Sequence, residues 1–127
     1  MKIKELYTGL TSLRIPTRDL DDTILFYNEL GFQITLPTTD PGTESRVAFL
    51  RFQDLMIEGY ETEEIPACPA RLTLWVSDIE ETYDTICNRV LNNLDDVVHS
   101  LPYWENGIRF FTIEGPSGEK VAFCQQL

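Results

Sequence analysis

The chain contains one pattern of strand, helix and further strands twice over. Residues 12–16 (SLRIP) and residues 71–76 (RLTLWV) alternate apolar and polar side chains, which is typical of half-buried strands. Each segment is followed by an aspartate, Asp19 or Asp78, that stands at the start of a helical pattern. The two copies align with an offset of 59 residues, the distance from Asp19 to Asp78. In a chain of 127 residues this repeat predicts a single domain built from two similar modules.

Both helical stretches carry signals for their start and for their buried face. In the first, Asp19 is the predicted N-cap, and Leu20, Ile24 and Tyr27 recur at helical spacing. Gly31 is expected to end this helix. The stripe predicts that the helix packs on a core. The second stretch repeats these signals with Asp78 as cap, Glu81 at the capping-box position, and a stripe of Ile79, Tyr83, Ile86 and Val90.

Each helix is followed by up to three strands. Residues 46–52 (RVAFLRF) and 108–113 (IRFFTI) are strand-like, and each leads through a turn into a further strand at 55–60 or 119–125. Val97 and Val98 are candidates for the start of a short strand, and residues 101–107 are expected to form a loop. We therefore predict an α+β fold with module 1 at about residues 8–60, a linker at 61–70 and module 2 at about 71–127.

The charge balance limits the classes of partner. The chain has 10 basic and 21 acidic residues, a net charge of −11, which repels nucleic acid and anionic membranes and favours cationic ligands. The N-terminus lacks the apolar run of a signal peptide, and no apolar segment approaches membrane-spanning length, so a cytoplasmic location is expected. Three widely spaced cysteines, at positions 68, 87 and 124, are expected to be reduced and mostly buried.

Several motifs together resemble the vicinal oxygen chelate superfamily of glyoxalases, ring-cleaving dioxygenases, and fosfomycin and bleomycin resistance proteins. They are residues 15–34 (IPTRDLDDTILFYNELGFQI), 54–58 (DLMIE), 72–83 (LTLWVSDIEETY) and 115–123 (GPSGEKVAF), and the first two look most like the bleomycin resistance branch. The resemblance implies two βαβββ modules whose mixed sheets curve into a cup with the helices outside and the ligand inside. It also implies a small-molecule ligand and a homodimer. The helix that follows Asp19 is then expected to pack on the core and not to contact the ligand.

The resemblance also implies where a metal ion is held in the metal-using members. The four positions correspond to Ser12, Glu58, Arg71 and Ala122, and only Glu58 has a side chain suited to a divalent ion. Such an ion needs at least three protein donors, and Arg71 brings a permanent positive charge. We therefore expect no metal and no cofactor. His99, the single histidine, has no partner at a catalytic spacing.

Strand alternation predicts which side chains point into the cup. If Leu13 and Ile15 face the helix, Ser12 and Arg14 face inward, and the same reasoning applies to the other strands. Aromatic residues of the 101–107 loop are expected near the mouth of the cup or as anchors to the core, and Arg109 faces either in or out. The candidate ligand-binding residues are Ser12, Arg14, Glu58, Tyr60, Arg71, Trp75, Trp104 and Arg109. Thr73 and Met56 are expected on the same inward faces, and Tyr103 on the same loop as Trp104.

Three functions remain open from the sequence. The first is a metal-independent protein that sequesters a cationic or planar antibiotic of the bleomycin type or a related ligand. The second is a glyoxalase-like lyase or isomerase with Glu58 as general base and Arg14 or Arg71 holding an oxyanion. The third is an interaction module whose cup is filled. An Arg–Glu pair that only replaces a lost metal is a structural alternative to ligand binding.

Overall fold

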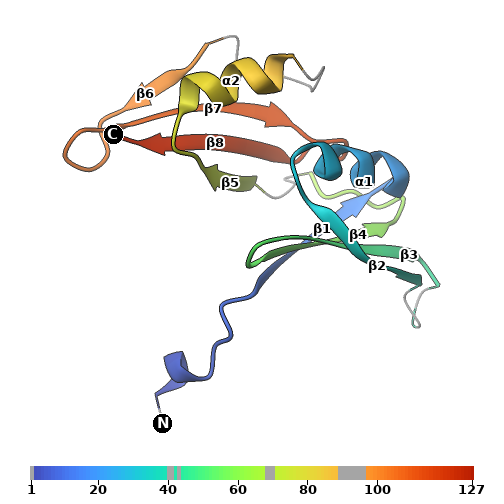
Figure 1. Cartoon of the computed structure of the whole chain (residues 1–127). Coiled ribbons are helices and arrows are strands. Elements are labelled where there is room, and N and C mark those ends of the chain that lie inside the picture. The colour runs from blue at the N-terminus through green and yellow to red at the C-terminus, as the bar shows by residue number, and fades with distance from the viewer. Residues whose placement is uncertain (1, 40–41, 43, 68–70, 89–96) are drawn as a thin grey trace. The chain divides into compact units, whose positions relative to one another are not determined.

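The computed structural model describes residues 2–39, 42, 44–67, 71–88 and 97–127. The chain divides into two compact units, Met1–Pro66 and Ala67–Leu127, and each is described by itself. Unit 1 contains the 3-10 turn η1 (Ile3–Glu5), β1 (Thr11–Thr17), α1 (Leu20–Glu29), β2 (Gln33–Thr39), β3 (Arg46–Phe52) and β4 (Leu55–Glu61). Unit 2 contains β5 (Arg71–Trp75), α2 (Ile79–Cys87), β6 (His99–Leu101), β7 (Ile108–Glu114) and β8 (Lys120–Gln126) (Figure 1).

The two units have the same sheet topology. The strand order is β1-β4-β3-β2 in unit 1 and β5-β8-β7-β6 in unit 2. In each unit the first strand pairs in parallel with the last, and the other pairs are antiparallel. The parallel pair requires a crossover, which α1 and the following hairpin supply in unit 1. The predicted α+β fold of two βαβββ modules is confirmed.

Helix α1 begins and ends at the predicted residues. The Asp19 carboxylate accepts a hydrogen bond from the Asp22 N–H at 3.1 Å, which caps the first turn. At the other end, Gly31 has a φ of +103°, and the Phe32 N–H donates to the Tyr27 carbonyl at 3.0 Å. This is a Schellman ending, in which the left-handed backbone of Gly31 turns the chain into β2.

The core of unit 1 lies between α1 and one face of its sheet. Its fully buried side chains include Ile15, Leu20, Tyr27, Phe32, Leu50 and Ile57. At position 59 a Cβ atom would lie 3.1 Å from the Leu20 Cδ1 atom, so a glycine lets β4 approach the helix closely. The predicted stripe needs one correction. Ile24 is only half-buried, whereas Thr23 is buried and its hydroxyl donates to the Thr17 hydroxyl at 2.9 Å.

The core of unit 2 repeats this arrangement. The Asp78 carboxylate caps α2 by accepting from the Glu81 N–H at 3.0 Å. Ile79 and Ile86 are buried, as predicted, and the Tyr83 ring packs edge-on against Phe111 at 5.0 Å between centroids. Val90, the last residue of the predicted stripe, lies outside the described residues.

Two strands and one cysteine differ from the sequence-based expectations. The short strand near Val97 begins two residues later, as β6. Of the cysteines, Cys124 is buried but Cys87 is exposed, which corrects the expectation for that residue, and Cys68 lies outside the described residues. Strand β2 was not predicted as a separate segment, and all seven of its residues are exposed. None of the described helices is long and apolar enough to cross a membrane.

Candidate functional site

The face of the unit 1 sheet that points away from α1 carries the candidate residues of β1 and β4. The two strands pair in register, with Ser12 opposite Met56 and Arg14 opposite Glu58. Gly59 faces α1, so its neighbours on β4, Glu58 and Tyr60, face the opposite way. Strand alternation therefore brings Ser12, Arg14, Glu58 and Tyr60 onto one face, as the sequence predicted.

Arg14 contacts two of these residues at once. Its Nε atom lies 3.0 Å from the Glu58 Oε2 atom, and its Cζ atom lies 3.9 Å from the centre of the Tyr60 ring. The guanidinium is thus held by an ion pair and by the face of an aromatic ring. The side chain of Arg14 is 54% exposed and that of Glu58 is 27% exposed, so water reaches the pair. Ion pairs that water reaches usually contribute no more than about 1 kcal/mol to stability.

The four positions that correspond to metal ligands offer few donors. Glu58 supplies the single carboxylate, and Arg14 already occupies it. Ser12 lies opposite Met56, Arg71 lies opposite Lys120, and Ala122 has only a methyl group. Within the described ranges, no three His, Cys, Asp or Glu side chains are grouped so as to hold a metal ion. This donor set does not meet the three-donor requirement of a divalent ion.

In unit 2 the candidate residues of β5 also share one face. Leu72 is buried between Arg71 and Thr73, both of which are exposed, and Trp75 is 56% exposed. Trp75 lies opposite Cys124 on β8. Burial raises the pKa of the Cys124 thiol, and the neighbouring positive charge of Arg71 opposes this shift.

Trp75 forms an exposed aromatic cluster with the loop that joins β6 to β7. The Trp104 ring stands edge-on to Trp75 at 5.8 Å between centroids, and the Tyr103 ring stands edge-on to Trp104 at 6.5 Å. Trp104 is 61% exposed and Tyr103 is also exposed, so neither ring anchors the loop to the core. Trp104 has a φ of +58°, an unfavourable backbone conformation for a bulky residue. The loop therefore presents an indole to the surface at a conformational cost.

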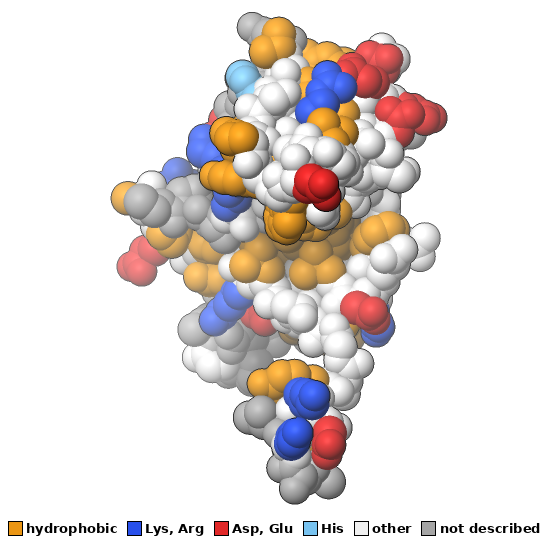
Figure 2. Space-filling view, turned by 90° about the vertical axis from the view of Figure 1, so that its left-hand side faces the viewer, with side chains coloured by type: hydrophobic (Ala, Val, Ile, Leu, Met, Phe, Trp, Pro, Cys, Tyr) orange, Lys and Arg blue, Asp and Glu red, His pale blue; other side chains and the backbone are white. Residues whose placement is uncertain are grey.

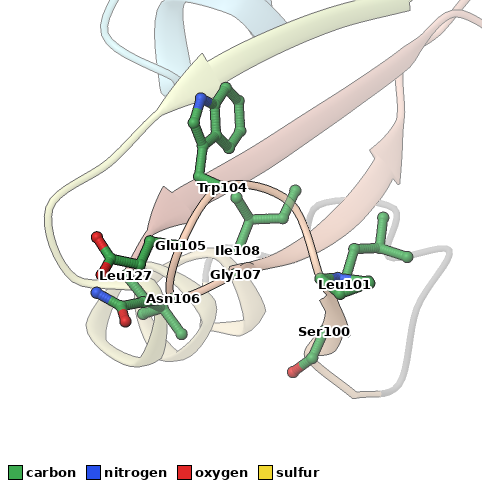
Figure 3. A pocket seen from close by; sticks show the side chains of 9 residues that line it. Ser100, Leu101, Trp104, Glu105, Asn106, Gly107, Ile108 and Leu127 are labelled. Carbon is green, nitrogen blue, oxygen red and sulfur yellow. The ribbon is translucent and has the colours of Figure 1, made fainter.

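A groove of about 530 Å³ lies along the same loop (Figure 3). Its apolar walls come from Leu101, Pro102, Ile108 and Leu127, and Glu105 adds a carboxylate. The sequence predicted a loop with two large aromatic residues here but did not predict the groove. The wall that the sequence did not predict is Leu127. Its N–H donates a hydrogen bond to the Gly107 carbonyl at 3.0 Å, which holds the C-terminus beside the loop.

Arg109 lies on a different face of the unit 2 sheet from the candidate residues of β5. It forms an ion pair with Glu80 in the first turn of α2. Phe111, two residues further along β7, packs against Tyr83 of the same helix. Arg109 therefore lies on the helix-covered face of the unit 2 sheet, opposite the face that carries Trp75.

Comparison with known proteins places the chain in a family through one relative. No family model matches the chain. The chain is 33% identical over 121 residues to the uncharacterised protein YwbC of Bacillus subtilis strain 168, with 88% of this chain and 93% of YwbC covered. The chain belongs to the family of YwbC. Solved structures then extend the comparison to the level of the fold.

Two of the similar structures have informative names. A glyoxalase/bleomycin resistance protein/dioxygenase from Nocardioides has a TM-score of 0.73 at 18% identity, and the match covers 98% of this chain and 90% of that one. A bleomycin resistance determinant encoded on transposon Tn5 has a TM-score of 0.65 at 23% identity, with 91% and 96% covered. The YwbC relative therefore has the glyoxalase/bleomycin resistance protein/dioxygenase fold, which confirms the superfamily resemblance at the level of the fold.

Proposed function

We propose that this YwbC relative binds a small organic ligand without a metal ion and without chemical turnover. The ion pair between Arg14 and Glu58, at 3.0 Å, is the observation that carries this proposal. Glu58 is the one carboxylate among the positions that correspond to metal ligands, and Arg14 places a positive charge beside it. A divalent cation at this point is repelled by the guanidinium and finds its ligand already occupied.

The same ion pair argues against Glu58 as the general base of a glyoxalase-like lyase or isomerase. Its carboxylate already forms an ion pair with the positively charged guanidinium of Arg14. To take a proton from a substrate it has to give up that contact, and Arg14 loses a partner while it remains stacked on Tyr60. We therefore favour binding over catalysis.

The exposed aromatic cluster and the net charge suggest the class of ligand. Trp75 and Trp104 offer two indole rings to the surface, and such rings stack on planar groups and attract cations. The net charge of −11 steers a cationic ligand toward the protein. The similarity to a bleomycin resistance determinant supports a cationic antibiotic with planar rings, of the bleomycin type, which the protein sequesters. A homodimer is part of the proposal by analogy with the superfamily.

Calorimetric titration with metal-free bleomycin tests the ligand. We expect saturable binding to the unaltered protein, and an affinity roughly two- to tenfold weaker in Trp75→Ala and in Trp104→Ala, because each loses one stacking ring. Leu25→Ala is the matched control, since Leu25 is an exposed apolar residue of α1 and its loss should leave the affinity unchanged. If no heat of binding is seen at any concentration, bleomycin is not the ligand. If all variants bind with equal affinity, the aromatic cluster is not part of the binding site.

A further inference from the structure

The groove beside the loop that joins β6 to β7 has an apolar floor and a carboxylate at one side. Ile108 is the buried floor, and Leu101 and Leu127 form partly exposed walls. In Figure 3 the Glu105 carboxylate lies at one side of the groove and Leu101 at the other, with Ile108 between them. The volume of about 530 Å³ falls within the ~300–1,000 Å³ that is usual for small-molecule sites. The groove is therefore large enough for a small organic molecule.

The backbone of the loop holds the groove in shape. Gly107 has a φ of +85°, and a Cβ atom there would lie 2.9 Å from the Leu101 carbonyl oxygen. A glycine permits this close approach. On the other side, the hydrogen bond from the Leu127 N–H to the Gly107 carbonyl fixes the residue after β8 against the loop. Because the walls are already in place, a ligand does not have to order them, which favours binding.

The charge of the groove is negative among the residues that the structure describes. Glu105 is a lining residue, and no Lys, Arg or His of the described ranges lines the groove. In the same part of the chain Glu105 has no basic partner, whereas Glu80 on α2 pairs with Arg109. Figure 2 faces the side of Figure 1 on which this loop lies, and it shows hydrophobic side chains with an acidic one among them. The groove therefore suits a molecule that is apolar along its length and positively charged at one end.

We propose that the groove binds a small amphiphilic amine, whose aliphatic chain packs on Leu101 and Ile108 and whose ammonium group pairs with Glu105. Burial of the chain supplies most of the affinity, because an ion pair that water reaches contributes little. The carboxylate supplies selectivity among molecules of equal length, since it attracts a cation and repels an anion. The inference goes beyond the proposed function, because it concerns an aliphatic cation and holds whether or not bleomycin binds.

An NMR titration with a matched set of probes tests the site. Amide ¹H–¹⁵N spectra are recorded while octylammonium is added at concentrations too low for micelles, and we expect saturable shifts at Leu101, Gly107 and Leu127. Octanol, which has the same chain without the charge, should bind about two- to fivefold more weakly, and octanoate more weakly still. Ethylammonium, which has the charge on a short chain, should bind at least about tenfold more weakly. No shifts, shifts confined to residues outside the groove, or equal affinity for octylammonium and octanoate would overturn the inference.

Two variants separate the contributions of the carboxylate and the apolar wall. Glu105→Gln should lower the affinity for octylammonium to that for octanol and leave octanol binding unchanged. Glu63→Gln is the control, because it removes the same charge at an exposed position outside the groove. Leu101→Ser should weaken both probes by roughly two- to tenfold, and Glu105→Gln decides the question if Leu101→Ser does not fold. Octylammonium binding that Glu105→Gln leaves unchanged would contradict the inference. The calorimetric titration uses a different probe, so failure of either proposal can be recognised.

Discussion

Arg14 links the two side chains that face it, Glu58 through an ion pair and Tyr60 through the face of its ring. The position of Arg14 opposite Glu58 follows from the parallel register of β1 and β4. Sequence alternation placed both residues on one face, but their direct contact depends on that register, which joins segments 44 residues apart, from position 14 to position 58. The sequence therefore predicted the face and left open whether the charges pair.

Replacing Glu58 by glutamine should have a small effect on stability. The pair is reached by water, so we expect Glu58→Gln to lower the free energy of unfolding by at most about 1 kcal/mol in a urea titration. Glu63→Gln serves as the control, because the Glu63 carboxylate lies 4.0 Å from Arg18 and is almost fully exposed, and its loss should leave the unfolding midpoint unchanged. A loss of 3 kcal/mol or more in Glu58→Gln would mean that the pair behaves as a buried one.

The two described cysteines should differ in reactivity. Burial raises the pKa of the Cys124 thiol, so Cys124 stays protonated to a higher pH than an exposed thiol does. We expect Cys87 to be alkylated rapidly in the native protein at pH 8 and Cys124 to react at least about tenfold more slowly, as followed by peptide mass spectrometry. The variant Cys87→Ser confirms the assignment. Equal rates at the two sites in folded protein would contradict the burial of Cys124.

At the scale of elements, the same helix start occurs in both units. Asp19 caps α1 and Asp78 caps α2, each by accepting from the N–H three residues further on. We expect Asp19→Ala and Asp78→Ala each to lower the free energy of unfolding by about 1 kcal/mol, measured in urea, because each leaves an N–H at the helix start without its acceptor. Asp19→Asn and Asp78→Asn keep an acceptor and should lose less. If alanine and asparagine variants unfold alike, the caps do not contribute as described.

The elements with one buried face were the most predictable from the sequence. Residues 46–52 read as a strand and form β3 at those same residues. Strand β2 has no buried face to impose a pattern, and it contains Pro37, which an edge strand tolerates because its outer N–H groups need no partner. The groove was unpredictable for a different reason. Leu127 reaches the loop at Gly107 through the pairing of β7 and β8, which no local pattern indicates.

At the scale of the whole molecule, the two units share a topology but present different chemistry on equivalent strands. Arg14 pairs with Glu58 across β1 and β4, whereas Thr73 lies opposite Ala122 across β5 and β8. Unit 1 therefore places an ion pair on its open face, and unit 2 offers the exposed aromatic cluster. Among the residues that the structure describes, neither face supplies the set of donors that a divalent ion needs, which is the basis for proposing a binding protein that works without metal.

A fluorescence titration in a chelator tests this account most directly. The intrinsic fluorescence of the protein is followed while metal-free bleomycin is added in the presence of excess EDTA, and the titration is repeated with Zn²⁺ or Mn²⁺ in place of EDTA. We predict saturable quenching of the exposed Trp75 and Trp104 in EDTA, with the same affinity when metal is present. Quenching that appears only after a divalent cation is added would contradict metal-independent binding, and no quenching under either condition would contradict the ligand.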